Sequence, residues 1–232
     1  MALPLNEVPK YTCDLPSTGQ SITYRPFLVK EQKVMLMAME SEDENEISQA
    51  VIDTMQSCMV SEIDIKSLPI FDFEYLYLKV RAKSVGETVK LRIKCPDDEK
   101  EIVEKEINID KIEVDMPKDH TNKIEFEPGY GVIMNYPTIN TFQNVPESTT
   151  ALSFKLVQDS IQTIYKGDEV YDRNNISDKE LEEFVNNMTQ AQFTKVQTFF
   201  DTMPRVRHNI KYQNPKTGKD FEMNLTGTSD FF

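Results

Sequence analysis

Apolar residues recur at helical spacing through the first third of the chain. One stripe predicts an amphipathic helix. It starts at Val29, continues through Lys33, Leu36 and Met37, and ends near the acidic stretch 40–46. A second stripe predicts another helix and runs through Ile47, Ala50, Val51, Met55 and Cys58. Ser41 and Asn45 are candidate caps between the two helices. The carboxylates around them favour the amino end of the second helix.

A third helix is predicted to start near Pro69, because a first helical turn tolerates proline. It ends before Gly86, and its apolar stripe consists of Ile70, Phe73, Leu76, Tyr77 and Val80. Asp72 and Glu74 lie off this stripe. We therefore expect both carboxylates at the surface, where substitution by alanine costs little stability.

The middle of the chain is typical of β-structure, because apolar and polar residues alternate there. Strands are predicted at 88–94, 101–109, 112–116, 123–126 and 130–134. Pro128-Gly129 predicts a turn between the last two strands. Residues 135–148 contain Pro137 and Pro146 and are expected to form an irregular connection.

The last third returns to helical spacing. One predicted helix follows Leu152, Leu156, Ser160 and Ile164. Ser177 and Glu180 have the spacing of a capping box, which predicts a helix through Leu181, Phe184, Val185 and Met188. The segment 189–192 begins another helix, which ends before Pro204 and contains Phe193, Val196, Phe199 and Phe200.

Two β-hairpins are predicted near the ends of the chain, at 11–24 and 208–225. Their turns read Leu15-Pro16-Ser17-Thr18-Gly19-Gln20 and Asn214-Pro215-Lys216-Thr217-Gly218-Lys219, and 94–100 is a weaker third copy. Proline fixes φ at the first corner, and glycine accepts the positive φ that reverses the chain. We interpret the similarity as one hairpin module used two or three times.

These hairpins resemble the knuckles of zinc ribbons, in which paired cysteines occupy the turn. A structural zinc ion needs four nitrogen or sulfur ligands, usually as two close pairs. Only Cys95 occupies a knuckle position here, and Asp98 stands where its partner thiolate would be. We therefore expect ribbon-like hairpins without a metal and no other cofactor.

Together the patterns predict an α+β fold in which these short antiparallel hairpins, zinc-ribbon-like but metal-free, combine with about six helices. We expect three segments. Residues 1–95 hold a hairpin and helices, and 96–148 hold the β-rich section and the irregular connection. Residues 149–232 hold helices, the second hairpin and a tail.

Charge narrows the range of partners. The 39 acidic and 26 basic side chains give a formal charge of −13, and such a surface repels the phosphate backbone of nucleic acids.

The longest apolar run, 34–39, is far shorter than the ~20 residues that cross a bilayer. The start of the chain does not resemble a secretory signal. Three widely spaced cysteines, Cys13, Cys58 and Cys95, favour a reducing compartment and free thiols, with a single bridge left open. We expect no nucleic acid, no membrane and a cytoplasmic protein.

Catalytic motifs are not evident. The sequence contains no nucleophile elbow, Walker loop, dinucleotide fingerprint or zinc-protease motif. His120 lies in a charged loop, where an exposed imidazole is expected, and His208 opens a strand. We expect no small-molecule substrate. Two alternatives remain: a hydrolase whose site combines scattered carboxylates with one of these histidines, and a metal-binding adaptor.

Three segments of the chain carry a resemblance: Ala2–Asn6 with Tyr24–Glu31, Phe71–Leu76 with Arg81–Glu87, and the ending Leu225–Phe232. They resemble the T4-like phage base plate protein family, which includes the baseplate hub assembly protein. The resemblance implies a non-enzymatic protein that binds other baseplate and hub proteins of a contractile tail. It implies a place in the host cytoplasm during assembly, and brings no catalytic residues. Whether the protein stays in the virion or leaves as a chaperone is open.

Candidate partner-binding residues lie at the chain end and after the third helix. Arg81 and Lys83 could bind a partner's carboxylates. Asp230, Phe231 and Phe232 follow the segment 226–229, which we expect to be loosely held. Two terminal rings are costly to leave in water, so they dock either in this molecule or in a partner.

Deletion of Phe231 and Phe232 tests the second possibility. We expect the melting temperature to stay nearly unchanged while hub assembly is blocked, because two buried rings contribute ~1.5–3 kcal/mol each to binding. Thermal unfolding and co-purification of hub subunits measure the two effects. A drop of many degrees would instead assign the rings to this molecule's own core.

Overall fold

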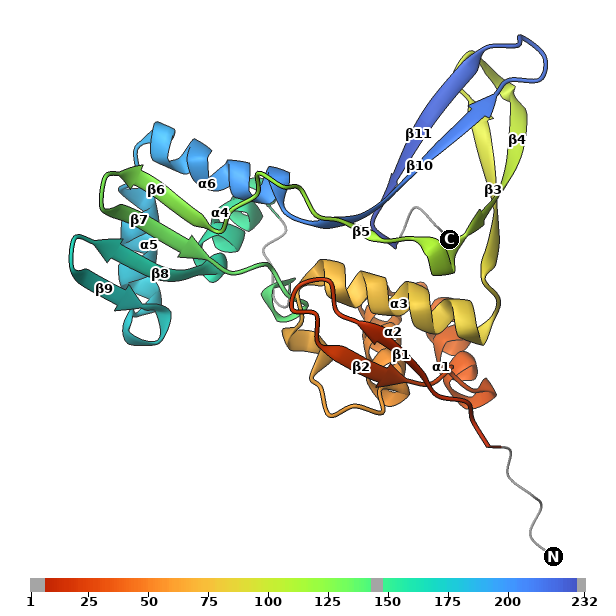
Figure 1. Cartoon of the computed structure of the whole chain (residues 1–232), viewed down its shortest axis with the longest axis horizontal. Coiled ribbons are helices and arrows are strands. Elements are labelled where there is room, and N and C mark those ends of the chain that lie inside the picture. Colours follow the sequence, from red (N-terminus) through yellow and green to blue (C-terminus); the bar gives the residue numbers. More distant parts are fainter. Residues whose placement is uncertain (1–6, 143–147, 229–232) are drawn as a thin grey trace, which may run out of the picture. The chain divides into compact units, whose positions relative to one another are not determined.

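The computed structural model describes residues 7–142 and 148–228, and within these ranges leaves out the side chains of Glu99 and Thr149. It confirms the α+β fold, with six α-helices and several small antiparallel sheets in the described part of the chain (Figure 1). The chain forms two compact units: residues 1–115 with 205–232, and residues 116–204. These units divide the chain at other places than the three segments expected from the sequence.

The first unit combines three hairpins with three helices. Its helices are α1 (Val29–Glu40), α2 (Glu44–Cys58) and α3 (Ile70–Ser84), with short 3-10 turns at Ile65–Ser67 and Ile109–Lys111. Its strands are β1 (Tyr11–Asp14), β2 (Ser21–Tyr24), β3 (Thr88–Cys95), β4 (Asp98–Asn108), β5 (Val114–Asp115), β10 (Arg205–Gln213) and β11 (Asp220–Thr226). β1 pairs with β2 and β3 with β4, and the third sheet has the order β11-β10-β5.

The second unit is a four-stranded sheet packed against helices. The sheet has the order β6-β7-β8-β9 and consists of Lys123–Glu127, Tyr130–Met134, Ile161–Lys166 and Glu169–Asp172. The helices are α4 (Thr149–Ser160), α5 (Asp178–Asn186) and α6 (Gln190–Thr202), with 3-10 turns at Asn140–Phe142 and Arg173–Asn175. Val132 and Ile164 from the sheet pack with Val157, Leu181 and Val196 from the helices in one core.

Helix α3 carries two cores on opposite faces. Leu76 and Val80 pack with the β1–β2 hairpin and α2, whereas Leu78 and Ala82 pack with β3, β4, β10 and β11. Residues two apart lie on nearly opposite sides of a helix, so one 15-residue helix separates both cores. The predicted stripe was therefore correct for Leu76 and Val80 but described only half of the buried surface.

The expectation that Asp72 and Glu74 are surface residues was wrong. Asp72 is fully buried and accepts hydrogen bonds from the backbone N and the Oγ of Ser17 in the β1–β2 turn. Glu74 is half-buried, and its Oε1 accepts from the backbone N of Thr228 at 3.3 Å. Burial raises the pKa of both carboxyls, and these hydrogen bonds act against the rise.

The two terminal hairpins share one turn structure. In the first, the N of Leu15 donates to the O of Gln20, and the N of Gly19 to the O of Leu15. The same two bonds recur from Asn214 to Lys219 and from Gly218 to Asn214. Gly19 and Gly218 have φ of 69° and 72°, as the sequence required. The third hairpin differs, because Cys95 pairs directly with Asp98 across a shorter turn.

Side-chain contacts join the turn of the β10–β11 hairpin to the turn of the β3–β4 hairpin. The carboxylate of Asp97 accepts from Nδ2 of Asn214 at 2.7 Å and from Oγ1 of Thr217 at 2.8 Å. Nζ of Lys216 lies 2.6 Å from Oδ2 of Asp98. The hydrogen bond from Asn214, with that from Thr217, keeps the pKa of Asp97 below its ordinary value despite partial desolvation. These contacts connect the distal ends of β3–β4 and β10–β11, which lie side by side in Figure 1.

Two boundaries differ from the sequence prediction. The helical stripe of 152–164 does not continue, because α4 ends at Ser160 and Ile164 lies in β8. The cap of α2 is Asp43 rather than Ser41 or Asn45, since its Oδ1 accepts from the N of Asn45 at 2.8 Å and of Glu46 at 3.2 Å. The capping box at Ser177 is confirmed, and the helix predicted to begin at 189–192 has a capping box of its own at Thr189.

Asp72→Ala and Asp72→Asn test the buried carboxylate. Alanine leaves both Ser17 donors without this acceptor, so we expect a loss of about 1–3 kcal/mol. A raised pKa means that wild-type stability falls as pH rises above the ordinary value of 3.8 and through the folded value. Asparagine does not ionise, so its stability relative to wild type should improve from acid to neutral pH. Urea unfolding at both pH values measures this. A difference that does not change with pH would contradict a raised pKa.

Candidate protein-binding surface

Helix α1 exposes apolar side chains on several of its sides. The predicted stripe was expected to face a core, but Val29 is 81% exposed and Met37 is 60% exposed. Of the described residues of α1, only Glu31 is buried. We name the α1 surface as the set of exposed apolar residues on this helix: Val29, Val34, Leu36, Met37 and Met39. Apart from Val29, these apolar side chains follow a polar first turn.

A polar contact, not an apolar core, anchors the start of α1. Oε1 of Glu31 accepts from Nη2 of Arg25 at 2.9 Å, and Oε2 accepts from the backbone N of Leu28 at 2.6 Å. Burial disfavours the charged form of Glu31. The hydrogen bonds from Arg25 and Leu28, with the charge of Arg25, outweigh it and hold the pKa below its ordinary value. The anchor leaves the apolar side chains of the helix free to bind.

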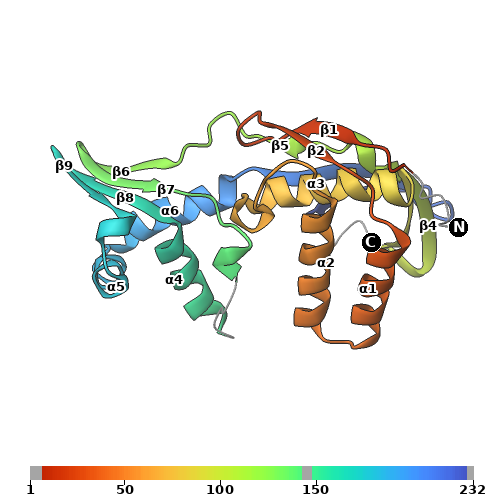
Figure 2. The same ribbon diagram turned by 90° about the horizontal axis from the view of Figure 1, so that it is seen from below.

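Helix α2 runs beside α1 and forms a helical hairpin with it (Figure 2). A shallow groove of about 280 Å³ lies between them and is lined by Lys30, Glu31, Val34, Asp53, Thr54 and Ser57. The connection between the helices is acidic, with Glu40, Glu42, Asp43, Glu44 and Glu46 all exposed. The hairpin therefore combines an apolar surface with a negatively charged end.

The two basic residues predicted to bind a partner are not together. They are two positions apart on α3 and so lie on nearly opposite sides of it. Nζ of Lys83 pairs with Glu87 at 2.6 Å and with Asp110 at 2.9 Å. Arg81 lies near Tyr77, where its charge acts against the burial that raises the pKa of the phenol. Partner binding by Arg81 and Lys83 stays a prediction.

The segment before the chain end is better held than expected. Thr226 is the last residue of β11 and pairs with Arg207. The N of Gly227 donates to the O of Val206 at 3.1 Å, and Thr228 contacts Glu74 as described above. The predicted binding residues Asp230, Phe231 and Phe232 lie outside the described residues.

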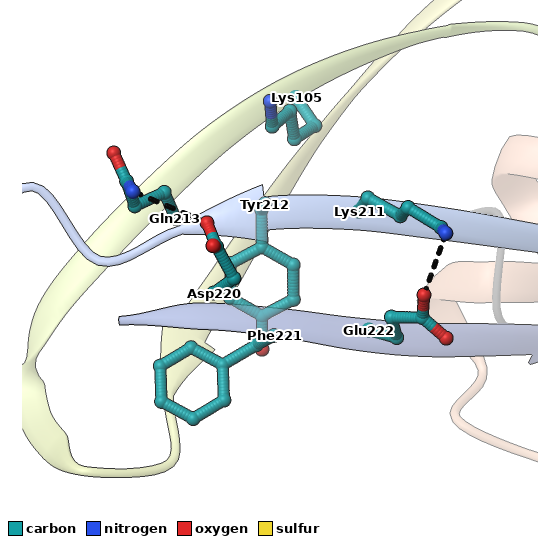
Figure 3. A pocket seen from close by; sticks show the side chains of 7 residues that line it. All are labelled: Lys105, Lys211, Tyr212, Gln213, Asp220, Phe221 and Glu222. Carbon is teal, nitrogen blue, oxygen red and sulfur yellow. Dashed lines mark hydrogen bonds and ion pairs between the residues drawn. The ribbon is translucent and has the colours of Figure 1, made fainter. Parts of the chain in front are cut away.

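A hollow of about 670 Å³ lies along the β10–β11 hairpin (Figure 3). Its lining consists of Lys105, Lys211, Tyr212, Gln213, Asp220, Phe221 and Glu222. Lys211 and Glu222 pair across the strands at 2.8 Å, and Nε2 of Gln213 donates to Asp220 at 3.1 Å. These polar side chains satisfy one another, and the lining contains no histidine, cysteine or serine.

His120 is not the exposed imidazole that the sequence predicted. Its ring stacks on Tyr136, with centroids 5.6 Å apart, and lies 5.1 Å from the ring of Phe199. Nδ1 lies 3.0 Å from Oγ1 of Thr202. Burial lowers the pKa of this imidazole. The contacts of His120 are thus aromatic rings and a hydroxyl rather than the carboxylates that the hydrolase alternative requires.

The thiols and carboxylates do not gather into a metal centre. Cys13, Cys58 and Cys95 are free thiols. Burial raises the pKa of Cys13 and of Cys58 to about 11, which makes them weak nucleophiles. Among residues 7–142 and 148–228, no group of three or more metal-binding side chains could hold an ion. Cys95 pairs with Asp98 in the strand ladder, as a knuckle without its second thiol.

Comparison with known proteins gives the family. Residues 8–232 match the model of the T4 bacteriophage base plate proteins. The chain belongs to this family. Its members are baseplate components of a phage, and the match spans both compact units of the present baseplate protein. No curated protein and no solved structure matches the chain.

The baseplate protein has, in the described residues, no helix that is long and apolar enough to cross a membrane.

The apolar run that forms the α1 surface was visible in the sequence as 34–39, the longest uninterrupted apolar stretch. An apolar run without a polar face was the signal for this surface, and the interpretation of α1 as an ordinary amphipathic helix missed it.

Glu31→Gln tests the anchor of α1. The lowered pKa means that Glu31 stabilises the fold above its ordinary value of 4.5, and that this stability is lost as pH falls through the lower folded value. At neutral pH we expect the variant to lose about 1–3 kcal/mol, because Arg25 loses a charged partner. The gap to wild type should close in acid. Urea unfolding at several pH values measures it, with exposed Gln32→Glu as a control that should show no such pattern. A gap that stays constant with pH would argue against this anchor.

Proposed function

We propose that this baseplate protein is a non-enzymatic structural or assembly component of the baseplate hub, and that it binds a neighbouring baseplate protein through the α1 surface. Membership of the family gives the baseplate, and the exposed apolar helix supports the proposed binding. The hub, the direct contact and the choice between a permanent and a transient role are parts of the proposal.

The exposure of α1 is the observation that carries this proposal. Four of its large apolar side chains lie within six consecutive residues: Val34, Leu36, Met37 and Met39. Burying one such side chain yields ~1.5–3 kcal/mol, so a partner that covers several of them gains enough to offset the cost of association. Methionine is flexible and polarisable, and therefore adapts to the shape of a partner.

Charge adds a requirement for the partner. The α1 surface adjoins the acidic connection 40–46, so a partner that covers both needs an apolar face with a basic rim. A helix of a neighbouring baseplate protein with this pattern fits the α1–α2 hairpin. A second copy of this chain fits less well, because its own surface has a formal charge of −13.

Met37→Lys and Gln32→Lys separate apolar binding from charge. Both substitutions place a lysine on an exposed position of the same helix, but only the first removes apolar area. We expect Met37→Lys to retain the wild-type melting temperature and to lose co-purification of the other baseplate proteins from phage-infected cells. Gln32→Lys should retain both.

Identification of the co-purified chains as baseplate proteins is part of the measurement. Equal binding by Met37→Lys and wild type would show that the α1 surface is not the contact. Equal loss in both variants would mean that added charge, rather than lost apolar area, disrupts binding. A large fall in the melting temperature of Met37→Lys would place this side chain in the protein's own core.

A further inference from the structure

The two edges of the β6-β7-β8-β9 sheet are protected to different degrees. At the β6 edge, Nζ of Lys195 from α6 donates to the backbone O of Glu125 at 2.9 Å and of Phe126 at 3.2 Å. The β6–β7 register also shifts between Glu125 and Glu127. A bulge and a lysine over the edge carbonyls are features that prevent a further strand from pairing.

The β9 edge has no such protection among the described residues. β9 pairs with β8 on one side and lies at the end of the sheet (Figure 1). Its two central residues are apolar and exposed, Val170 to 67% and Tyr171 to 47%. An exposed strand edge with apolar residues and no bulge is a template for strand addition.

The register of β9 shows which backbone groups point outward. The β8–β9 hairpin closes with the pair Lys166–Glu169 around Gly167 and Asp168. Hydrogen-bonded and non-bonded pairs alternate along an antiparallel ladder, and the pair that closes a two-residue turn is bonded. The N–H and C=O groups of Val170 and the N–H of Asp172 therefore point away from β8, whereas the C=O of Asp172 belongs to the 3-10 turn Arg173–Asn175 that follows.

Side chains on both faces of β9 would be covered by an added strand. Tyr171 is opposite Ile164 of the core, whereas Val170 is opposite Tyr165 on the other face of the sheet. The hydroxyl of Tyr171 donates to Glu169 at 2.7 Å, which holds the ring along the edge. An incoming strand buries one apolar side chain on each face.

The ends of β9 are acidic, and this charge limits which strand can pair with its free edge. Asp168 and Glu169 precede the apolar pair and Asp172 follows it. Residues whose backbone groups point outward face one another across an antiparallel ladder, so Val170 of one copy would face Val170 or Asp172 of the second. With Val170 opposite Val170, Asp168 would face Asp172, and like charges directly opposite each other destabilise strand pairing. With Val170 opposite Asp172, a carboxylate would take the place of an apolar partner, so a second copy is a poorer occupant than a segment with basic ends.

We propose that the free edge of β9 binds an extended segment of another protein, with an apolar centre and a basic residue at each end, as a fifth strand of the sheet. Backbone hydrogen bonds to both groups of Val170 and to the N–H of Asp172 supply the pairing, and the carboxylates at both ends supply the selectivity. This surface lies in residues 116–204 and does not depend on binding by α1 in the other unit.

The test uses the full-length chain and a labelled synthetic peptide with lysines at both ends of a β-branched apolar centre. We expect saturable binding below about 1 mM, seen by fluorescence anisotropy, and slower hydrogen exchange at the amides of Val170 and Asp172. A peptide with glutamates in place of the lysines should bind at least about tenfold more weakly, which is about 1.4 kcal/mol. No binding of the basic peptide, or equal binding of both peptides, would overturn the proposal.

Variants of β9 locate the binding. Val170→Pro removes an outward N–H that β8 does not use, and Val170→Lys keeps the backbone but repels the basic peptide. Either should weaken binding at least about tenfold. Val85→Lys removes an exposed valine from the other unit and should bind as wild type does. Unchanged binding by both Val170 variants would overturn the proposal. So would self-association in sedimentation that Val170→Lys abolishes, because the occupant would then be a second copy.

Discussion

The first unit depends on the burial of α3 between two cores. A helix with apolar residues on both faces has no side left for solvent along its first turns, so its polar residues there must find partners inside the protein. Asp72 accepts hydrogen bonds from the backbone N and the Oγ of Ser17, and Glu74 accepts one from the backbone N of Thr228. The turn of the first hairpin and the end of the last strand are thereby attached to one helix, although Ser17 is 55 residues from Asp72 and Thr228 is 154 residues from Glu74 in sequence. Burying these two carboxyls raises their pKa, so the arrangement costs free energy of folding when they ionise.

Local signals in the sequence predicted most elements correctly. The helix starts at Pro69, Ser177 and Thr189 were found because capping chemistry is local, and the terminal hairpin turns because glycine at positive φ is local. The errors come from tertiary context. α4 passes directly into β8 at Ser160 with no glycine or proline between them, so the helical spacing appeared to continue to Ile164. Likewise Asp72 has no sequence feature that reveals the distant Ser17.

The candidate site was harder to predict than the fold, for a physical reason. An apolar residue that packs in its own core and one that packs against another protein obey the same hydrophobic effect, so their spacing along a helix is the same. Val29, Leu36 and Met37 were expected to be buried and are exposed. Arg81 and Lys83 were predicted to bind a partner's carboxylates because they are basic and follow the apolar stripe, yet helical geometry directs them to nearly opposite sides of α3. The edge of β9 could not be inferred at all, because strand order is a property of the whole sheet.

The polar anchor of α1 explains how the protein can keep an apolar helix uncovered. If apolar packing alone held α1, the side chains that bind a partner would be used in the fold, and binding would require local unfolding. Instead, Glu31 fixes the first turn through Arg25 and Leu28, while the apolar side chains contribute little to the protein's own stability. The cost is a surface on which copies of the chain could aggregate. Carboxylates next to each exposed apolar surface, at 40–46 beside α1 and at both ends of β9, oppose contact between identical copies. In both proposed binding modes the same carboxylates would favour a partner with basic residues, so a single charge pattern would both disfavour self-association and select the neighbour.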